Sequence, residues 1–187
     1  MVKLLRINQH PEKNLVEKLR KGDRRAQAEV FEKYSRQMLG ISRRYVQRLE
    51  DAEEVLCNAF VKAFGQIHQY DEDGALGAWL RRIVINESLN YIRYKKNLFV
   101  EMEEEHIEMS IASPTTEKFE AEELLALINE LPLGYRTVFN LFAIEGYSHK
   151  EIAGMLQISE GTSKSQLRKA RLQLQQQLES GHRAQTI

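Results

Sequence analysis

Cysteine, proline and glycine are all scarce in this chain, and each shortage narrows what the protein can be. Cys57 is the single cysteine among 187 residues, so disulfide bonds and cysteine-rich metal sites are excluded, and a reducing compartment is the simplest interpretation. Only 3 prolines and 10 glycines interrupt the chain, and apolar residues recur at helical spacing along most of it. The sequence therefore predicts an all-α fold.

Motifs that carry catalysis are also missing. There is no glycine-rich phosphate loop, no nucleophile elbow and no HExxH zinc motif. The 5 histidines are scattered, and no two of them stand four residues apart. The N-terminal segment MVKLLRINQHPEK lacks the apolar core of a signal peptide, and no apolar run is long enough to span a bilayer. We therefore expect a cytoplasmic protein that is not an enzyme, holds no metal or cofactor and does not insert into a membrane.

Charge is balanced over the whole chain but not along it. Residues 1–97 carry 19 Lys and Arg against 13 Asp and Glu, and residues 161–187 carry five basic residues and one acidic residue. Two basic regions are typical of a protein that touches a polyanion at two places. Between them, clustered acids, a proline and the lack of a clear period predict a flexible acidic linker at 98–115. This linker would join one small helical domain at 1–97 to another at 116–187.

The N-terminal domain is expected to hold four helices. They are predicted at 11–21, from the cap Asp23 to about 49, from the cap Asp51 to 70, and at 76–96. Trp79 on the last helix is expected in the core. Tyr70, beside the polar break at 71–74, is the better candidate for stacking on a base, because a loop residue can be exposed.

A polar row marks the helix at 76–96. Arg82, Asn86, Asn90 and Arg93 fall four, four and three residues apart, so they share one face, and Lys95 and Lys96 extend it. Such rows are usually solvated surface. Asparagine, however, is a mediocre helix former that offers both a donor and an acceptor to a base edge. The row therefore favours contact with nucleic acid.

The C-terminal domain is predicted to end in a helix-turn-helix, supported by helices at about 116–130 and 131–146. Ser148 and Glu151 have the spacing of a capping box, Gln157 begins a tight turn, and Ser159 can cap the second helix. The stripe expected to pack inward is Ser163, Leu167, Ala170, Leu174 and Leu178. The outer side carries Thr162, Lys164, Ser165, Arg168, Lys169 and Arg171. This pattern favours a recognition helix in a DNA major groove, and the alternative is a basic solvated helix that ends a bundle.

Four segments of the chain resemble an extracytoplasmic-function (ECF) sigma factor, the two-domain minimal class of bacterial transcription initiation factors. They are DAEEVLCNAFVKAF at 51–64, GAWLRRIVINESLNYIRYKK at 77–96, L-P-x-x-Y-R-x-V-F at 131–139 and E-I-A-x-x-L-x-I-S-x-G-T-x-K-S at 151–165. Each motif alone is moderately specific, and all four in this order are highly specific. The resemblance implies a protein that binds core RNA polymerase, directs it to promoters through the minus-thirty-five and minus-ten elements, and assists promoter melting.

The resemblance also assigns residues to three surfaces. Those expected to bind core polymerase are Asp51, Glu54, Asn58, Val61 and Lys62. Those expected along the minus-ten element are Gln69, Tyr70, Arg82, Asn86, Asn90, Arg93, Lys95 and Lys96, with the loop around 69–74 placed to hold an unstacked base. Those expected in or beside the minus-thirty-five major groove are Glu160, Gly161, Thr162, Lys164, Ser165, Arg168, Lys169 and Arg171.

Several residues depart from the family pattern. Cys57 and Asn58 stand where Gln-Glu is usual, and Asn90 replaces a frequent aspartate. Gln157 replaces the usual turn glycine, which costs roughly 1–2 kcal/mol if the backbone there is left-handed. Ser163 replaces an inward valine and is expected to weaken packing of the recognition helix.

The resemblance implies several partners. They are the clamp and flap regions of core polymerase, promoter DNA as duplex and as non-template single strand, and, in many family members, an anti-sigma factor. The free protein is expected to be a monomer. Two other functions remain open from the residues: a helix-turn-helix regulator that acts on duplex DNA without being a polymerase subunit, and a helical adaptor that sequesters a partner protein.

Overall fold

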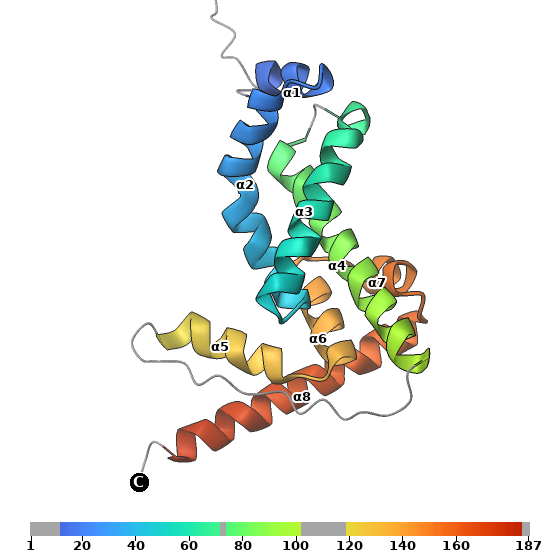
Figure 1. Cartoon of the computed structure of the whole chain (residues 1–187). Coiled ribbons are helices and arrows are strands. Elements are labelled where there is room, and N and C mark those ends of the chain that lie inside the picture. Colours follow the sequence, from blue (N-terminus) through green and yellow to red (C-terminus); the bar gives the residue numbers. More distant parts are fainter. Residues whose placement is uncertain (1–11, 72–73, 102–118, 185–187) are drawn as a thin grey trace, which may run out of the picture. The chain divides into compact units, whose positions relative to one another are not determined.

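The computed structural model describes residues 12–71, 74–101 and 119–184, and every regular element in these ranges is helical (Figure 1). The chain divides into two compact units, Met1–Leu98 and Phe99–Ile187. The elements of the first unit are α1 (Lys13–Arg20), α2 (Arg24–Tyr45), α3 (Leu49–Gly65), the short 3-10 helix η1 (Ile67–Gln69) and α4 (Leu76–Glu101). Those of the second are α5 (Phe119–Glu130), α6 (Leu133–Phe139), the π-helical η2 (Asn140–Ile144), α7 (His149–Leu156) and α8 (Glu160–Ala184).

Helix boundaries agree with the sequence where a side chain caps the backbone. The Asp23 carboxylate accepts hydrogen bonds from the backbone N–H groups of Arg25 and Ala26, as predicted. The prediction for Asp51 is wrong, because α3 begins at Leu49 and Asp51 lies in its first turn. There the carboxylate still faces the positive end of the helix dipole. The linker expected to begin at residue 98 is helical up to Glu101, and the rest of that segment lies outside the described residues.

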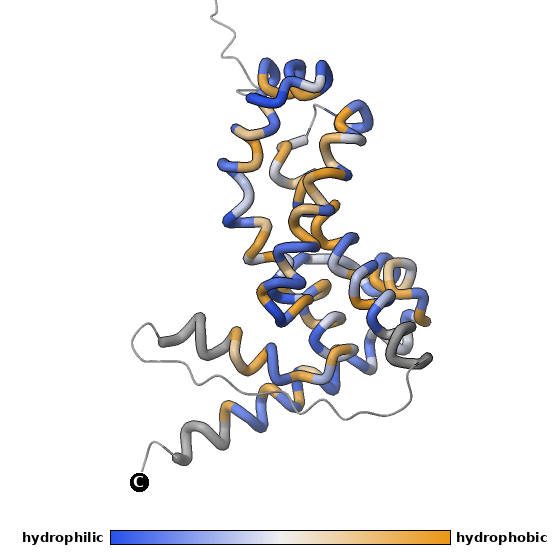
Figure 2. The backbone as a smooth tube through the Cα atoms, viewed as in Figure 1, coloured by the Kyte–Doolittle hydropathy of each residue, from blue (hydrophilic) through white to orange (hydrophobic). Residues whose placement is uncertain are grey.

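The core of the first unit is built by apolar faces of α2, α3 and α4 (Figure 2). Its largest fully buried side chains are Tyr45, Met38, Ile67, Leu76, Ile85, Val16, Val30, Val55 and Val84. α1 packs on α2 and η1. Burial of such side chains stabilises a fold by about 1.5–3 kcal/mol each, so these faces hold the first unit together.

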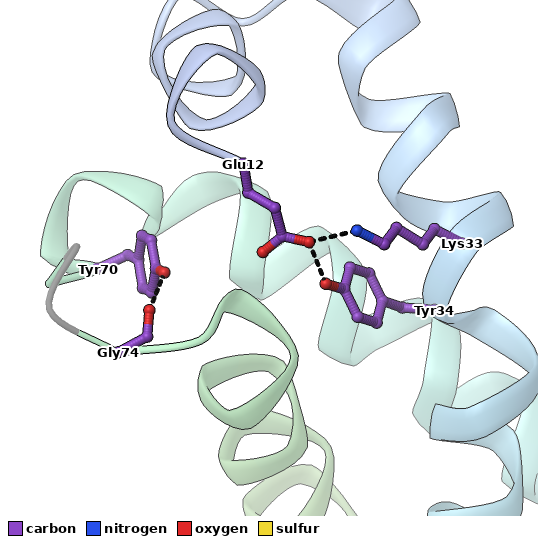
Figure 3. A network of polar contacts seen from close by, with 5 residues as sticks. All are labelled: Glu12, Lys33, Tyr34, Tyr70 and Gly74. Atoms are coloured by element: carbon purple, nitrogen blue, oxygen red, sulfur yellow. Dashed lines mark hydrogen bonds and ion pairs between the residues drawn. The ribbon is translucent and has the colours of Figure 1, made fainter. Parts of the chain in front are cut away.

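A polar cluster ties the start of α1 to α2 (Figure 3). The Glu12 carboxylate accepts hydrogen bonds from the Lys33 ammonium and the Tyr34 hydroxyl. Burial opposes ionisation of Glu12, but these two hydrogen bonds outweigh it and lower the pKa of the carboxyl group. Beside this cluster, a Cβ added at Gly77 would lie 2.9 Å from the Tyr34 ring, so the first turn of α4 approaches α2 more closely than a side chain allows.

In the second unit, α6 and α7 pack on α8. Ile128 of α5 and Leu131, which follows it, form a buried cluster with Ala170 and Leu174 of α8. Arg136 of α6 is 6% exposed and donates to the backbone carbonyls of Asn129 (2.8 Å) and Leu131 (3.4 Å) at the end of α5. Burial lowers the pKa of this guanidinium. The carbonyl ends of a helix carry partial negative charge, so the buried cation joins α5 to α6 without a carboxylate.

Candidate nucleic-acid interface

The helix-turn-helix of the second unit is formed by α7 and α8. Both halves of the predicted capping box are present: the backbone N–H of Ser148 donates to Glu151 at 2.8 Å, and that of Glu151 donates to the Ser148 hydroxyl at 3.3 Å. Gln157 ends α7 in the left-handed conformation, with φ 55° and ψ 45°. The Ser159 hydroxyl then accepts the backbone N–H of Thr162 at 2.9 Å and caps α8, as predicted.

α8 separates a buried stripe from an exposed polar face. Ser163, Leu167, Ala170 and Leu174 are buried as expected, but Leu178 is 45% exposed, so the stripe ends one turn earlier than predicted. Seven of the residues assigned to the minus-thirty-five element are exposed, namely Glu160, Gly161, Lys164, Ser165, Arg168, Lys169 and Arg171, and Thr162 is half-buried.

Two of the basic residues on α8 also contact aromatic rings. The Lys169 ammonium lies 5.9 Å from the centre of the Tyr135 ring, and the Arg171 guanidinium lies 5.7 Å from that of Phe142. Such cation–π contacts restrain a long side chain, and both residues remain exposed. Lys164 and Arg168 are the basic residues of this face for which no such contact is seen among the described residues.

Ser163 is the departure from the family pattern that the structure explains. It is fully buried, and its hydroxyl lies 2.9 Å from Nδ1 of His149 in the first turn of α7. His149 in turn stacks on Phe142, with ring centroids 4.6 Å apart and an interplanar angle of 20°. A hydrogen bond between α7 and α8 therefore stands where a valine would give only apolar contact, which offsets the packing loss expected from the sequence.

On α4 of the first unit, the structure exposes the predicted polar row. Arg82, Asn86, Asn90 and Arg93 are all exposed. Lys95 is half-buried, and its ammonium lies 3.9 Å from the Asp51 carboxylate of α3. The side chain of Lys96 lies outside the described residues.

Tyr70 is not the exposed stacking residue that was predicted. It is only 7% exposed, its ring packs 5.5 Å from that of Trp79, and its hydroxyl donates to the carbonyl of Gly74 (Figure 3). The Arg20 guanidinium of α1 donates to the Tyr70 carbonyl at 3.1 Å. The Tyr70 ring packs on the half-buried Trp79 while its hydroxyl binds the loop backbone, so the residue holds the loop in place. Gln69 is exposed and remains available at this position.

The exposed face of α3 carries the residues assigned to polymerase. Glu54, Asn58 and Val61 are exposed, and Val61 is 72% exposed, the largest value among the exposed large hydrophobic side chains of the described residues. Cys57 is exposed beside them.

Two polar contacts of Glu87, one between α3 and α4 and one within α4, were missed by sequence reasoning. The Lys62 ammonium donates to Glu87 at 2.6 Å, and the Asn90 amide donates to the same carboxylate oxygen at 3.2 Å. The three-residue spacing of Glu87 and Asn90 could have indicated their contact on a helix. No local pattern indicates that of Lys62 and Glu87, which lie 25 residues apart. Near the other end of α3, burial and then the Asp51 carboxylate raise the pKa of Tyr91.

The described part of the chain offers neither a metal site nor a membrane span. No cluster of three or more His, Cys, Asp or Glu side chains there could hold a metal ion. None of the helices in that part has both the length and the apolar character needed to cross a bilayer.

These features define a two-unit helical protein with a helix-turn-helix in one unit and an exposed polar helix face in the other. The family model for sigma-70 region 2 matches residues 30–97, and that for sigma-70 region 4 matches residues 121–174. The RNA polymerase sigma-H factor of Pseudomonas aeruginosa is 30% identical over 88% of this chain and 92% of its own length. The ECF sigma-E factor of Haemophilus influenzae is 26% identical over 88% and 94%. The chain therefore belongs to the sigma-70 family of RNA polymerase sigma factors, in the ECF class.

Solved structures agree with this fold. The sigma factor RpoE of Bartonella quintana, in complex with the anti-sigma factor NepR, matches with a TM-score of 0.54 and 22% identity over 76% of this chain and 89% of that one. CnrH, in complex with the cytosolic domain of CnrY, matches with a TM-score of 0.51 and 22% identity over 89% and 96%. At this level of identity the likeness concerns the fold alone.

Proposed function

We propose that the two units of this sigma factor divide promoter recognition between them. Residues 1–97 bind core RNA polymerase and the minus-ten element, residues 116–187 bind the minus-thirty-five element, and the acidic segment between them links the two. The observation that carries this assignment is that each unit exposes a polar, basic helix face of its own, on α4 and on α8. Polymerase supplies the chemistry of RNA synthesis, so the protein itself needs no catalytic group, and it acts in the cytoplasm where polymerase works.

The second unit reads duplex DNA through α8. Lys164, Ser165 and Arg168 are exposed one turn and more beyond the helix start, on the side opposite the buried stripe. A helix-turn-helix places this part of its second helix against base edges in the major groove, where a good bidentate contact discriminates by about 1–3 kcal/mol. Lys169 and Arg171, restrained on Tyr135 and Phe142, contact phosphates at the edge of the groove.

The first unit captures the non-template strand as the duplex opens. The row of Arg82, Asn86, Asn90 and Arg93 runs along α4 and combines charges for phosphates with amides for bases. Each base that is stacked or held outside the duplex can return on the order of 1–3 kcal/mol. That return offsets the cost of unpairing, so melting proceeds without ATP. Gln69 and the backbone around it, braced by Arg20 and Tyr70, form one side of the base-holding loop.

Core polymerase binds the exposed face of α3, through Glu54, Asn58 and Val61 with Asp51 and Lys62 at its edges. An anti-sigma factor is a further partner, because both solved sigma-like folds compared above are complexes, one of them with a named anti-sigma factor. The acidic segment at 98–115, most of which lies outside the described residues, is long enough to join two promoter sites. The 14 positions that follow α4, 102–115, can span up to about 3.3–3.6 Å each.

The experiment that tests this function is reconstitution with core polymerase, followed by mapping of transcript starts across a genomic library. We expect the full-length chain to join the polymerase and to redirect its starts to a common sequence pattern. A helix-turn-helix regulator would instead bind duplex DNA without polymerase, and family membership does not favour it. A helical adaptor would show no salt-dependent affinity for DNA. Failure both to join polymerase and to move its starts would refute the proposal.

The polymerase surface is tested by Val61→Glu. The substitution places a charge at a 72% exposed position, so the fold should be unchanged while association with polymerase falls. Co-purification with core polymerase measures the association, and circular dichroism checks the fold. Normal co-purification would remove this face of α3 from the interface.

The recognition helix is tested by two substitutions on α8. Arg168→Ala should lose discrimination within the minus-thirty-five element, because a base contact is removed. Lys169→Ala should weaken binding to all sequences alike and reduce the salt dependence by about one phosphate contact. Affinity for specific and scrambled duplexes at several salt concentrations separates the two effects. If both variants lose affinity equally on every sequence, the assignment of Arg168 to a base is wrong.

A further inference from the structure

Glu87 occupies an unusual position for an acidic residue, because it stands beside the polar row of α4 that we assign to DNA. Its carboxylate oxygen Oε1 accepts a hydrogen bond from the Lys62 ammonium of α3 at 2.6 Å. The same oxygen accepts a second one from the Asn90 side-chain amide at 3.2 Å. The Glu87 side chain is 17% exposed and that of Lys62 is 42% exposed, whereas Asn90 lies on the exposed face. Glu87 thus connects a residue of the polymerase surface to one of the DNA surface.

The chemistry of this contact determines which way the Asn90 amide faces. Glu87 forms an ion pair with the Lys62 ammonium at 2.6 Å, and an ionised carboxylate accepts hydrogen bonds but donates none. Only the amide nitrogen of Asn90 can therefore lie against Glu87. The amide oxygen Oδ1 must then point away from Glu87. Without this partner, the terminal torsion of asparagine has a broad, roughly two-fold preference, and either atom can face outward.

We propose that Glu87 is a positioning residue for promoter specificity. It holds the Asn90 amide so that an acceptor, Oδ1, is presented to the captured strand. An acceptor selects a base that carries an exocyclic amino group, as adenine, cytosine and guanine do, over thymine. The single donor of an unpaired thymine, N3–H, lies between the carbonyl oxygens O2 and O4, which repel an approaching acceptor. This inference rests on the proposed role of α4 at the minus-ten element and adds a base preference to it.

The test uses holoenzyme reconstituted from core polymerase and the full-length chain. Start-site mapping with the wild-type protein first yields its own promoter, and a library of that promoter with a randomised minus-ten element then measures the base preference at each position. Asn90→Ala identifies the position that Asn90 reads. There we expect the wild-type protein to favour amino-bearing bases over thymine by roughly fivefold or more.

Glu87→Gln tests the orientation itself. Glutamine has nearly the same shape but can either donate or accept, so it no longer dictates which atom of Asn90 faces outward. We expect this variant to reduce the preference to roughly twofold or less at the position that Asn90→Ala identifies, and to leave the other positions unchanged. Asn86→Ala is the matched control, because it removes an exposed amide of the same helix that should read a different position.

A double variant, Glu87→Gln with Asn90→Asp, supplies the rescue. The new aspartate can accept a hydrogen bond from the glutamine amide and still present an acceptor to the base, and the pair keeps one negative charge beside Lys62. We expect it to regain the preference for amino-bearing bases.

Four outcomes would overturn the inference: a wild-type preference for thymine at the Asn90 position, an unchanged profile for Glu87→Gln, a loss spread evenly over all positions, or a double variant without rescue. These are distinguishable from failure of the proposed function, in which the wild-type protein itself yields no specific starts and the inference falls with it.

Discussion

The turn between α7 and α8 offers a direct test of backbone strain in this protein. Gln157 adopts φ 55° and ψ 45°, and it is the one non-glycine residue with positive φ in the described part of the chain. Its side chain is exposed, so a substitution to glycine removes little besides the Cβ that makes this conformation unfavourable. Gln157→Gly should therefore stabilise the second unit.

The magnitude follows from two opposing terms. A left-handed conformation costs an L-residue about 1–2 kcal/mol, which glycine avoids. Glycine also gives the unfolded chain more conformational freedom, which destabilises the folded state by about 0.4–1 kcal/mol and cancels part of that gain. The expected net stabilisation is about 1 kcal/mol, or a rise in melting temperature of about 4–8 °C for a domain of 60–100 residues. Gly146 is the opposite case, because a glycine already stands at positive φ, 81°. Gly146→Ala should therefore destabilise the same unit by about 1 kcal/mol.

Native-state hydrogen exchange of the full-length chain is the suitable assay, because it reports α7 and α8 separately from the first unit. A Cβ at Gly146 would meet no atom within 4 Å among the described residues, so tertiary clashes do not complicate the comparison. Binding to the minus-thirty-five duplex should change little, since neither residue lies on the outer face of α8. Unchanged or lower stability in Gln157→Gly would show that this turn is not strained and would refute the reasoning.

Two further predictions concern the first unit. Gly77→Ala should lower the free energy of unfolding of this unit by about 1–3 kcal/mol, since the new Cβ would lie 2.9 Å from the Tyr34 ring. Gly40→Ala should raise it by up to about 1 kcal/mol, because a Cβ there meets nothing within 4 Å among the described residues and alanine is the better helix former. Urea unfolding followed by the fluorescence of Trp79 measures both, and equal effects would argue against the close approach. Because Glu12 has a pKa lowered below its ordinary value of 4.5, its stabilisation is complete above that pH and is lost as pH falls through the folded pKa. Unfolding from pH 7 to 2 should therefore show a stability gap between the wild-type protein and Glu12→Gln that closes in acid, and a gap independent of pH would contradict it.

The features that the sequence predicted well depend on residues close together along the chain. The Asp23 cap, the capping box of Ser148 and Glu151, and the cap at Ser159 all form as expected, since each joins a side chain to backbone two or three residues away. The inward position of Ser163 and the shared exposed face of Asn86 and Asn90 follow from helical periodicity in the same way.

Residue roles that depend on another helix were the ones that the sequence misassigned or missed. Tyr70 is buried because Trp79 and the loop carbonyl of Gly74 meet it, and Leu178 is 45% exposed although it continues the buried stripe of α8. Glu87 acquires its position from Lys62, a residue of a different helix. Periodicity along one helix determined which side chains share a face. Only the tertiary structure decided what covers that face, because contacts between distant segments depend on how the helices pack and leave no trace in local spacing.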